Sequence, residues 1–295
     1  MKITTSMLHR NFLRETNMNQ VRIEELQLEL ATGKKVAKPS DDAFTTATIL
    51  SLTDSKSRLE QYQRNIASAE LYLERTDAVL ADVNDLLVRA KELAAQGASE
   101  TTNPTDRAAI AVEVDELRQQ LVALANSSHN NKFIFSGTET ETLPFTVGVG
   151  GAVTYNGNND RVQVQVTDAD FVESNIPGDT VFQSTVDIFQ VFSDLSTELN
   201  ADNTPGIAAQ LAQLELSETQ ISEARTEIGA IMQRTQESDD RHASDEVSLA
   251  SRISKEGDAD LAESISELVQ EETAVRATLA IFPRITQTNL LDFMA

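Results

Sequence analysis

The chain has 295 residues, of which 40% are hydrophobic but only 5% aromatic, with no Cys, no Trp and a formal net charge of −23. The missing Cys excludes disulfides and thiolate metal sites, and the strongly acidic balance argues against a nucleic-acid partner. No apolar run approaches the roughly 20 residues of a membrane span, and the first residues lack the apolar core of a cleaved signal. The sequence therefore predicts either a cytoplasmic protein or one exported without such a signal.

A first helix is predicted over residues 5–31. Its apolar stripe steps by three and four residues, with Thr16 and Asn19 filling the intermediate positions, which is the spacing of a coiled-coil seam. The apolar members of the stripe are Leu8, Phe12, Ile23, Leu26 and Leu30. Gly33 supplies a C-terminal cap, and a Lys-rich loop leads to Ser40 and two Asp residues that suit the start of a new helix.

The longest helical pattern follows, over residues 42–96, with a possible break near residues 53–55. Apolar residues recur every 3.5 positions from Leu59 to Ala94, interrupted only by Thr76. Residues 110–124 carry a matching seam after a polar turn, so an antiparallel pair of helices is expected. We favour an intramolecular core for these two seams.

The middle of the chain is a different kind of structure. Six of the eleven Gly and seven of the eleven Phe fall in the segment from Phe133 to Phe192. Residues 152–166 alternate between apolar and polar positions and predict two strands that form a hairpin around Asn156 and Gly157. The same Asn- and Asp-rich turn could be considered for calcium, but it lacks the 12-residue loop that ends in Glu, so an ordinary turn is preferred.

Helices resume near residue 184 and again at Pro205, with a polar middle at 237–242 that predicts a solvated face. Gly257 marks a break. The last helix places Leu261, Leu268, Val275 and Phe282 seven residues apart, with Leu279 on the neighbouring stripe, until Pro283 interrupts the pattern. The tail is apolar, and Leu290 and Phe293 lie in a segment where only Arg284 and Asp292 are charged after Arg276.

The order of these elements is palindromic, so the two ends of the chain are expected side by side. The predicted fold is mainly α: an elongated antiparallel helical bundle or coiled coil of N- and C-terminal segments, with a small β-rich insertion. We expect a terminal helical domain (1–40 and 257–295), a helical rod (41–132 and 186–256) and a β-rich outer domain (133–185). Residues 1–39 carry a net +3 and residues 261–295 a net −3, so head and tail could attract each other.

Several segments resemble the flagellin superfamily of bacteria, and among its members most closely the hook-associated proteins. They include "ATGKKVAKPSDDAFTTA", "LEQYQRNI", "DRAAIAVEVDELRQQLVALAN", "FIFSGTETETLPF" and "DADLAESISELVQ". The resemblance covers both helical arms, about residues 1–140 and 205–295. One departure is Ala43, where the family usually has Pro, but Ser and Asp still cap the helix.

The resemblance implies a structural subunit of the extracellular flagellum, exported through the flagellar type III channel and without enzymatic activity. Such subunits join hook to filament by polymerising with neighbouring copies between another hook-associated protein and flagellin, and an export chaperone binds their C-terminal helix. The terminal seams are then expected to pack against other subunits. The subunit-packing residues are Leu8, Phe12, Ile23, Leu26, Leu30, Leu261, Leu268, Val275, Leu279, Phe282, Leu290 and Phe293.

Two other functions stay open at this point. One is flagellin, the main subunit of the filament itself. The other, from a different class, is a cytoplasmic acidic helical adaptor whose tail binds one stable partner helix. An enzyme is remote, because no catalytic, cofactor-binding or metal-binding pattern is visible and His9, His129 and His242 are most simply surface polar residues.

Overall fold

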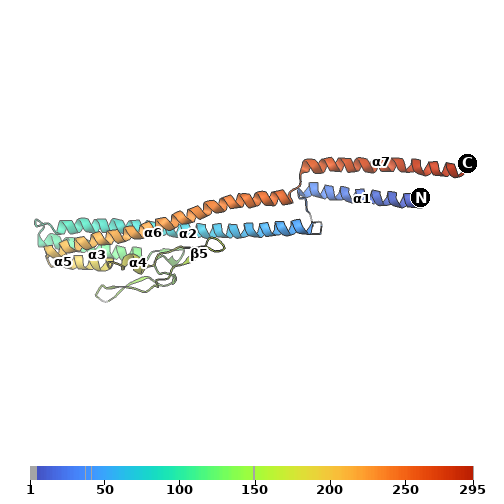
Figure 1. Cartoon of the computed structure of the whole chain (residues 1–295). Helices are drawn as coiled ribbons and strands as arrows, with labels where there is room; N and C mark the ends of the chain where they lie inside the picture. The colour runs from blue at the N-terminus through green and yellow to red at the C-terminus, as the bar shows by residue number, and fades with distance from the viewer. Residues whose placement is uncertain (1–4, 37, 41, 149, 295) are drawn as a thin grey trace. The chain divides into compact units, whose positions relative to one another are not determined.

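The computed structural model describes residues 5–36, 38–40, 42–148 and 150–294, and the chain is mainly α-helical (Figure 1). Contacts divide it into two units: unit 1 holds Met1–Arg58 with Ser244–Ala295, and unit 2 holds Leu59–Ala243. Helices α2 (Ala43–Gly97) and α6 (Thr204–Gly257) contribute to both units. The predicted mainly-α fold with a small β insertion is confirmed, whereas the division into three domains stays a prediction.

Four helices form most of unit 2: α2 from residue 59, α3 (Pro104–Ala125), α5 (Ile188–Asn200) and α6 to residue 243. The heptad seam of α2 is buried as predicted, and Leu73, Leu80 and Leu87 are almost inaccessible to water. The seam of α3 is buried in the same core. Helix α2 runs without the expected break near residues 53–55, because nothing in that segment prevents i to i−4 hydrogen bonding.

Three separate two-stranded antiparallel sheets make up the β structure. They pair β1 (Ser128–His129) with β2 (Lys132–Phe133), β3 (Phe145–Val147) with β4 (Val153–Tyr155), and β5 (Gln163–Gln165) with β6 (Phe171–Glu173). The hairpin predicted around Asn156 and Gly157 is therefore wrong, since its two strands pair with different partners. The loop between them is instead held by Asn158, whose backbone and side chain bond Ser136 and Thr138.

An aromatic cluster joins the β insertion to the helices of unit 2. The ring of Phe145 lies 5.4 Å from that of Phe182, in the short helix α4 (Gly178–Phe182), and 5.0 Å from that of Phe189 in α5, measured between centroids. These distances are in the range where aromatic rings attract each other beyond simple burial. Four of the chain's eleven Phe residues, Phe135, Phe145, Phe182 and Phe189, therefore pack the middle segment onto the helices.

The polar stretch of α6 is in part the solvated face that its sequence predicts: Glu237, Asp240 and Arg241 are exposed, but other polar residues of the helix are not. Thr235, Ser238 and His242 are buried, and His242 Nε2 donates to the carbonyl of Val166, 2.6 Å away. The expectation that His242 is a surface residue is wrong, because the loop after β5 covers it. The seam of α6 thus continues with polar residues: the Thr235 hydroxyl donates to the carbonyl of Met232 within the helix, and His242 donates to the loop after β5.

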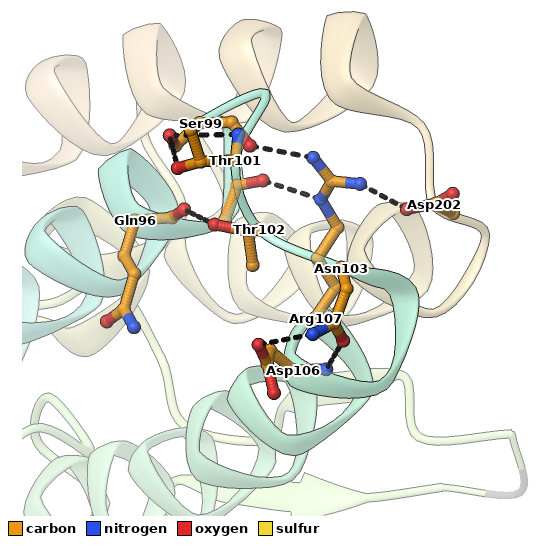
Figure 2. A network of polar contacts seen from close by, with 9 residues as sticks. Gln96, Ser99, Thr101, Thr102, Asn103, Asp106, Arg107 and Asp202 are labelled. Atoms are coloured by element: carbon orange, nitrogen blue, oxygen red, sulfur yellow. Dashed lines mark hydrogen bonds and ion pairs between the residues drawn. The ribbon is translucent and has the colours of Figure 1, made fainter.

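A buried arginine ties together the turn after α2, the start of α3 and the turn after α5 (Figure 2). Arg107 donates from Nε to the carbonyl of Gly97 and from Nη2 to that of Ser99, each at 2.8 Å, and its Nη1 pairs with Asp202. Its side chain is only 7% exposed. Asn103 caps α3 beside it by accepting from the backbone N–H of Asp106. These bonds satisfy carbonyls that the helix end would otherwise leave without donors.

We expect Arg107→Met to lower the free energy of unfolding of unit 2 by about 2 kcal/mol, because two carbonyls lose their donor in a water-poor site. Urea unfolding followed by circular dichroism measures this. The matched control is Arg89→Met, which removes an exposed arginine paired with Glu113 and should barely move the unfolding midpoint. Equal shifts for the two variants would contradict the assigned role of Arg107.

Candidate subunit-packing surface

Helices α1 (Thr5–Thr32) and α7 (Leu261–Met294) lie side by side in unit 1 and run antiparallel (Figure 1). Arg22 Nη2 donates to Glu267 at 2.8 Å, and one to two turns closer to the connection Ser264 Oγ donates to Glu29 at 3.2 Å. Moving forward along α1 therefore means moving back along α7. The prediction that the two ends of the chain lie side by side is confirmed for these described helices.

A short backbone bridge joins the ends of α1 and α6 where the pair begins. The N–H of Lys35 donates to the carbonyl of Gly257 at 2.8 Å, and the N–H of Ala259 donates to that of Gly33 at 3.0 Å. Gly33 has φ of +67°, a left-handed conformation that ends α1 as the sequence predicts. The two chain segments that follow α1 and precede α7 are thus hydrogen bonded to each other.

A side-chain ion pair reinforces this bridge. Lys34 Nζ lies 2.5 Å from Asp258 Oδ1, and Ser254 Oγ donates to the other carboxylate oxygen at 2.6 Å. The hydrogen bond from Lys34, followed by that from Ser254, holds the pKa of Asp258 below its usual value. Lys34 and Ser254 therefore stabilise the charged form of the Asp258 carboxylate.

Six of the residues predicted to pack against other subunits are partly or fully covered within the chain, and their role in subunit packing stays a prediction. Leu26 is 1% exposed, and Phe12, Ile23 and Leu30 are half-buried. On α7, Leu268 and Val275 are half-buried in the same way. Four predicted positions lie outside the described side chains: Leu8, Phe282, Leu290 and Phe293. Helix α7 itself continues over Pro283, so the predicted interruption there is wrong; a proline costs a helix one N–H···O bond without having to end it.

The outer faces of the pair are unusually apolar. Large apolar side chains that are between 40% and 59% exposed occur along both helices: Met7, Leu13, Met18, Val21 and Leu28 on α1, and Leu261, Ile265, Val269, Leu279 and Ile281 on α7. Two of the predicted packing residues, Leu261 and Leu279, belong to this exposed set. A pair of helices can cover only one face of each, so the apolar surface that remains suits packing against other helices.

Helix α1 carries a second apolar stripe beside the one that its sequence predicts. Met7, Met18, Val21 and Leu28 are separated by 11, 3 and 7 residues, which are sums of the same three- and four-residue steps. They lie about 200° around the helix from the seam at Ile23 and Leu26, by 100° per residue. The signal was present, but a single best-fitting stripe had accounted for the helix.

Other kinds of site find little support in the part of the chain that the structure describes. No group of three or more His, Asp or Glu side chains there is arranged to hold a metal ion. Helices among the described residues are also too short or too polar, over any stretch, to cross a bilayer. The apolar faces of α1 and α7 are the candidate functional surface, because they leave large apolar side chains exposed to water.

Comparisons with known proteins find similarity to flagellar proteins of bacteria. Residues 3–140 match the model of the bacterial flagellin N-terminal helical region. The flagellar hook-associated protein 3 of Escherichia coli is 25% identical over 319 aligned positions that cover 99% of each chain. A flagellin of Bacillus subtilis is 21% identical over the full length of both chains.

Solved structures share the fold. A flagellar hook-associated protein from Vibrio parahaemolyticus superimposes with a TM-score of 0.69 at 22% identity, covering 74% of this chain and all of that one. Because the identity is low, this likeness speaks for the fold and not for a particular function.

We expect the backbone bridge between the end of α1 and the end of α6 to weaken in acid. The lowered pKa of Asp258 means that its stabilising effect is present above the ordinary value of 3.8 and is lost as the pH falls through the lower, folded value. Hydrogen-exchange protection of the Lys35 and Ala259 amides should therefore fall below that pH. Asp258→Ala should reduce protection of both amides already at neutral pH, whereas exposed Glu256→Ala should not; unchanged protection in Asp258→Ala would contradict the role of the ion pair.

Proposed function

We propose that this chain, a member of the flagellin superfamily of the hook-associated protein 3 type, is a structural subunit of the extracellular bacterial flagellum that joins hook to flagellin filament by helical polymerisation. The observation that carries the proposal is the apolar surface left open on both sides of the α1–α7 pair. A subunit that must meet neighbours on several sides needs more than one exposed face, and a self-contained monomer does not.

The energy scale favours contact with several neighbours at once. Burying the exposed half of one large apolar side chain contributes on the order of 1 kcal/mol. A single face with four or five such residues then offsets only part of the roughly 4–15 kcal/mol that association costs. Two faces occupied together contribute about twice as much, which lies well within that range, so contacts with two neighbours at once favour an array over isolated pairs of copies.

The proposed partners follow from this arrangement. Neighbouring copies cover the sides of the α1–α7 pair, another hook-associated protein lies at one end of the array, and flagellin continues it at the other. Residues 1–40 and 257–295 then form the inner tube, residues 41–132 and 186–256 the rod around it, and residues 133–185 the outward part. The names of the E. coli and B. subtilis relatives, one a hook-associated protein and one a flagellin, support both kinds of neighbour.

An export chaperone is the proposed partner before assembly. The last 19 residues contain only two charged side chains, Arg284 and Asp292, in a chain with a net charge of −23. A helix with an apolar face binds readily in a groove of another protein, which would keep the tail from aggregating in the cytoplasm. Export through the flagellar type III channel then delivers the chain to the growing tip, and the tail exchanges the chaperone for other subunits.

Flagellin itself is the alternative, favoured by the full-length match to the B. subtilis protein. The identity to hook-associated protein 3 is higher over the same extent, which makes the junction the leading proposal. Counting copies per flagellum separates the two, because a junction needs few copies and a filament needs thousands.

We expect deletion of residues 276–295 to abolish attachment of filaments while leaving unit 2 folded. The deletion removes apolar surface of α7, and unit 2 contains none of the deleted residues. Electron microscopy of cells that carry only the truncated gene should show hooks without filaments. Urea unfolding of the purified variant is the control for unit 2, and normal filament growth on the truncated chain would overturn the proposal.

A further inference from the structure

Helix α1 carries a second, outward heptad seam that includes charges as well as apolar residues. Its positions step by four and three residues in strict alternation along one exposed face: Met7, Asn11, Arg14, Met18, Val21 and Glu25. The apolar members are 50–59% exposed, and the Arg14 side chain is 65% exposed. We call this row the outer stripe of α1.

Helix α7 carries a matching row beside its inward seam. Its members also step by three or four residues: Leu261, Ile265, Val269, Glu272, Arg276 and Leu279. The apolar ones are 50–58% exposed, and the side chains of Glu272 and Arg276 are 41% and 80% exposed. We call this row the flank stripe of α7. Each stripe thus has a pair of polar residues, Asn11 and Arg14 or Glu272 and Arg276, with apolar residues on both sides of it, and the outer stripe ends in the charged Glu25.

The two stripes cannot meet within one copy. The face of α1 that touches its own α7 contains Ile23 and Leu26, and the outer stripe lies about 200° away around the helix. In one copy Arg22 pairs with Glu267, a residue that is not on the flank stripe. Whatever covers the outer stripe must therefore come from another molecule.

We propose that the outer stripe of α1 seats, antiparallel, on the flank stripe of α7 in a neighbouring copy, in one specific register; this rests on the proposed polymerisation. With Arg14 opposite Glu272, three apolar layers coincide, and Glu25 at the end of the outer stripe is the one charge that meets an apolar residue, Leu261. Met18 then lies opposite Val269, Val21 opposite Ile265, and Met7 opposite Leu279.

Neighbouring registers lose this complementarity. A shift of one heptad in one direction places Arg14 opposite Leu279 and Val21 opposite Glu272. A shift in the other direction places Arg14 opposite Ile265 and Met7 opposite Glu272. Both place at least two charges against apolar side chains, which is costly, whereas the proposed register places one, Glu25 against Leu261, at the end of the stripe. The charged pair therefore selects the register, while the apolar layers supply most of the contact.

The contact is heterologous, since it joins different surfaces of the two copies. A copy that uses its outer stripe still offers its flank stripe to the next one, so the contact repeats in an open array or a ring and does not stop at a dimer. Within a copy, residue 267 faces residue 22 and residue 264 faces residue 29; in the proposed contact they would face residues 19 and 22. Successive copies are thus displaced along the helix axis by three to seven residues, roughly 5 to 10 Å.

A charge swap tests the register in the full chain. We expect Arg14→Glu and Glu272→Arg each to reduce the number of cells with attached filaments by about tenfold or more, because like charges then face each other across the contact. The double variant restores opposite charges and should recover attachment to within about twofold of the wild type. Single variants without effect, or a double variant no better than the singles, would overturn the register.

Cross-linking gives a second readout that does not depend on charge. The chain has no Cys, so the double variant Met18→Cys with Val269→Cys introduces the only thiols. Oxidation of isolated flagella should give a ladder of disulfide-linked multimers of this chain. The control replaces Leu13 and Val269, because Leu13 is 54% exposed on α1 but lies off the outer stripe. A ladder equally strong in the control, or a disulfide confined to single chains, would sink the inference.

These outcomes separate two failures. Absence of the wild-type chain from isolated flagella would remove the proposed function itself. A wild-type chain that is present and required there, together with a failed charge swap and no specific ladder, would remove only the proposed contact.

Discussion

The geometry of two packed helices is the constraint on which the rest of this structure depends. Helices α1 and α7 can each hide one stripe in the other, and Leu26 shows how complete that burial is at its best. Both helices nevertheless carry apolar residues on a second stripe, exposed to water in a single copy. In unit 2 the same problem does not arise, because four helices and the β insertion surround Leu80 and Leu87 from all sides. One chain therefore combines a closed core with an open pair.

Charge decides how such an open pair can exist in solution. A net charge of −23 makes copies repel each other at most orientations, which opposes indiscriminate clustering of the exposed apolar residues. Attraction then requires a contact in which apolar layers and opposite charges coincide, as at Arg14 and Glu272. Because one face is worth less than the cost of association, several such contacts must form together, and assembly is cooperative. Solubility of the single chain and stability of the array follow from the same residues.

The sequence predicted helices far better than it predicted β structure, for physical reasons. The seam from Leu59 to Ala94 repeats over many turns, so an error at one position such as Thr76 changes nothing. Strands of two or three residues have no such redundancy, and the partners of β4 and β5 depend on contacts made by Asn158 and His242 with distant elements. The buried polar residues of α6 escaped prediction because polarity alone cannot show that a loop covers them.

The sequence predicted one part of the packing surface and not the other. The inward residues Ile23 and Leu26 were found because they form the best apolar row, whereas Met7, Met18 and Val21 were overlooked because charged and amide residues interrupt their row. Those interruptions now carry the specificity: a wholly apolar stripe would accept any register, and a stripe with Arg14 in it accepts one that offers Glu272. A periodicity search ranks rows by hydrophobicity and so ranks the inward core first. The row that chooses a neighbour is recognised only when the exposed faces of both helices are compared, which requires knowing which faces the fold has already used.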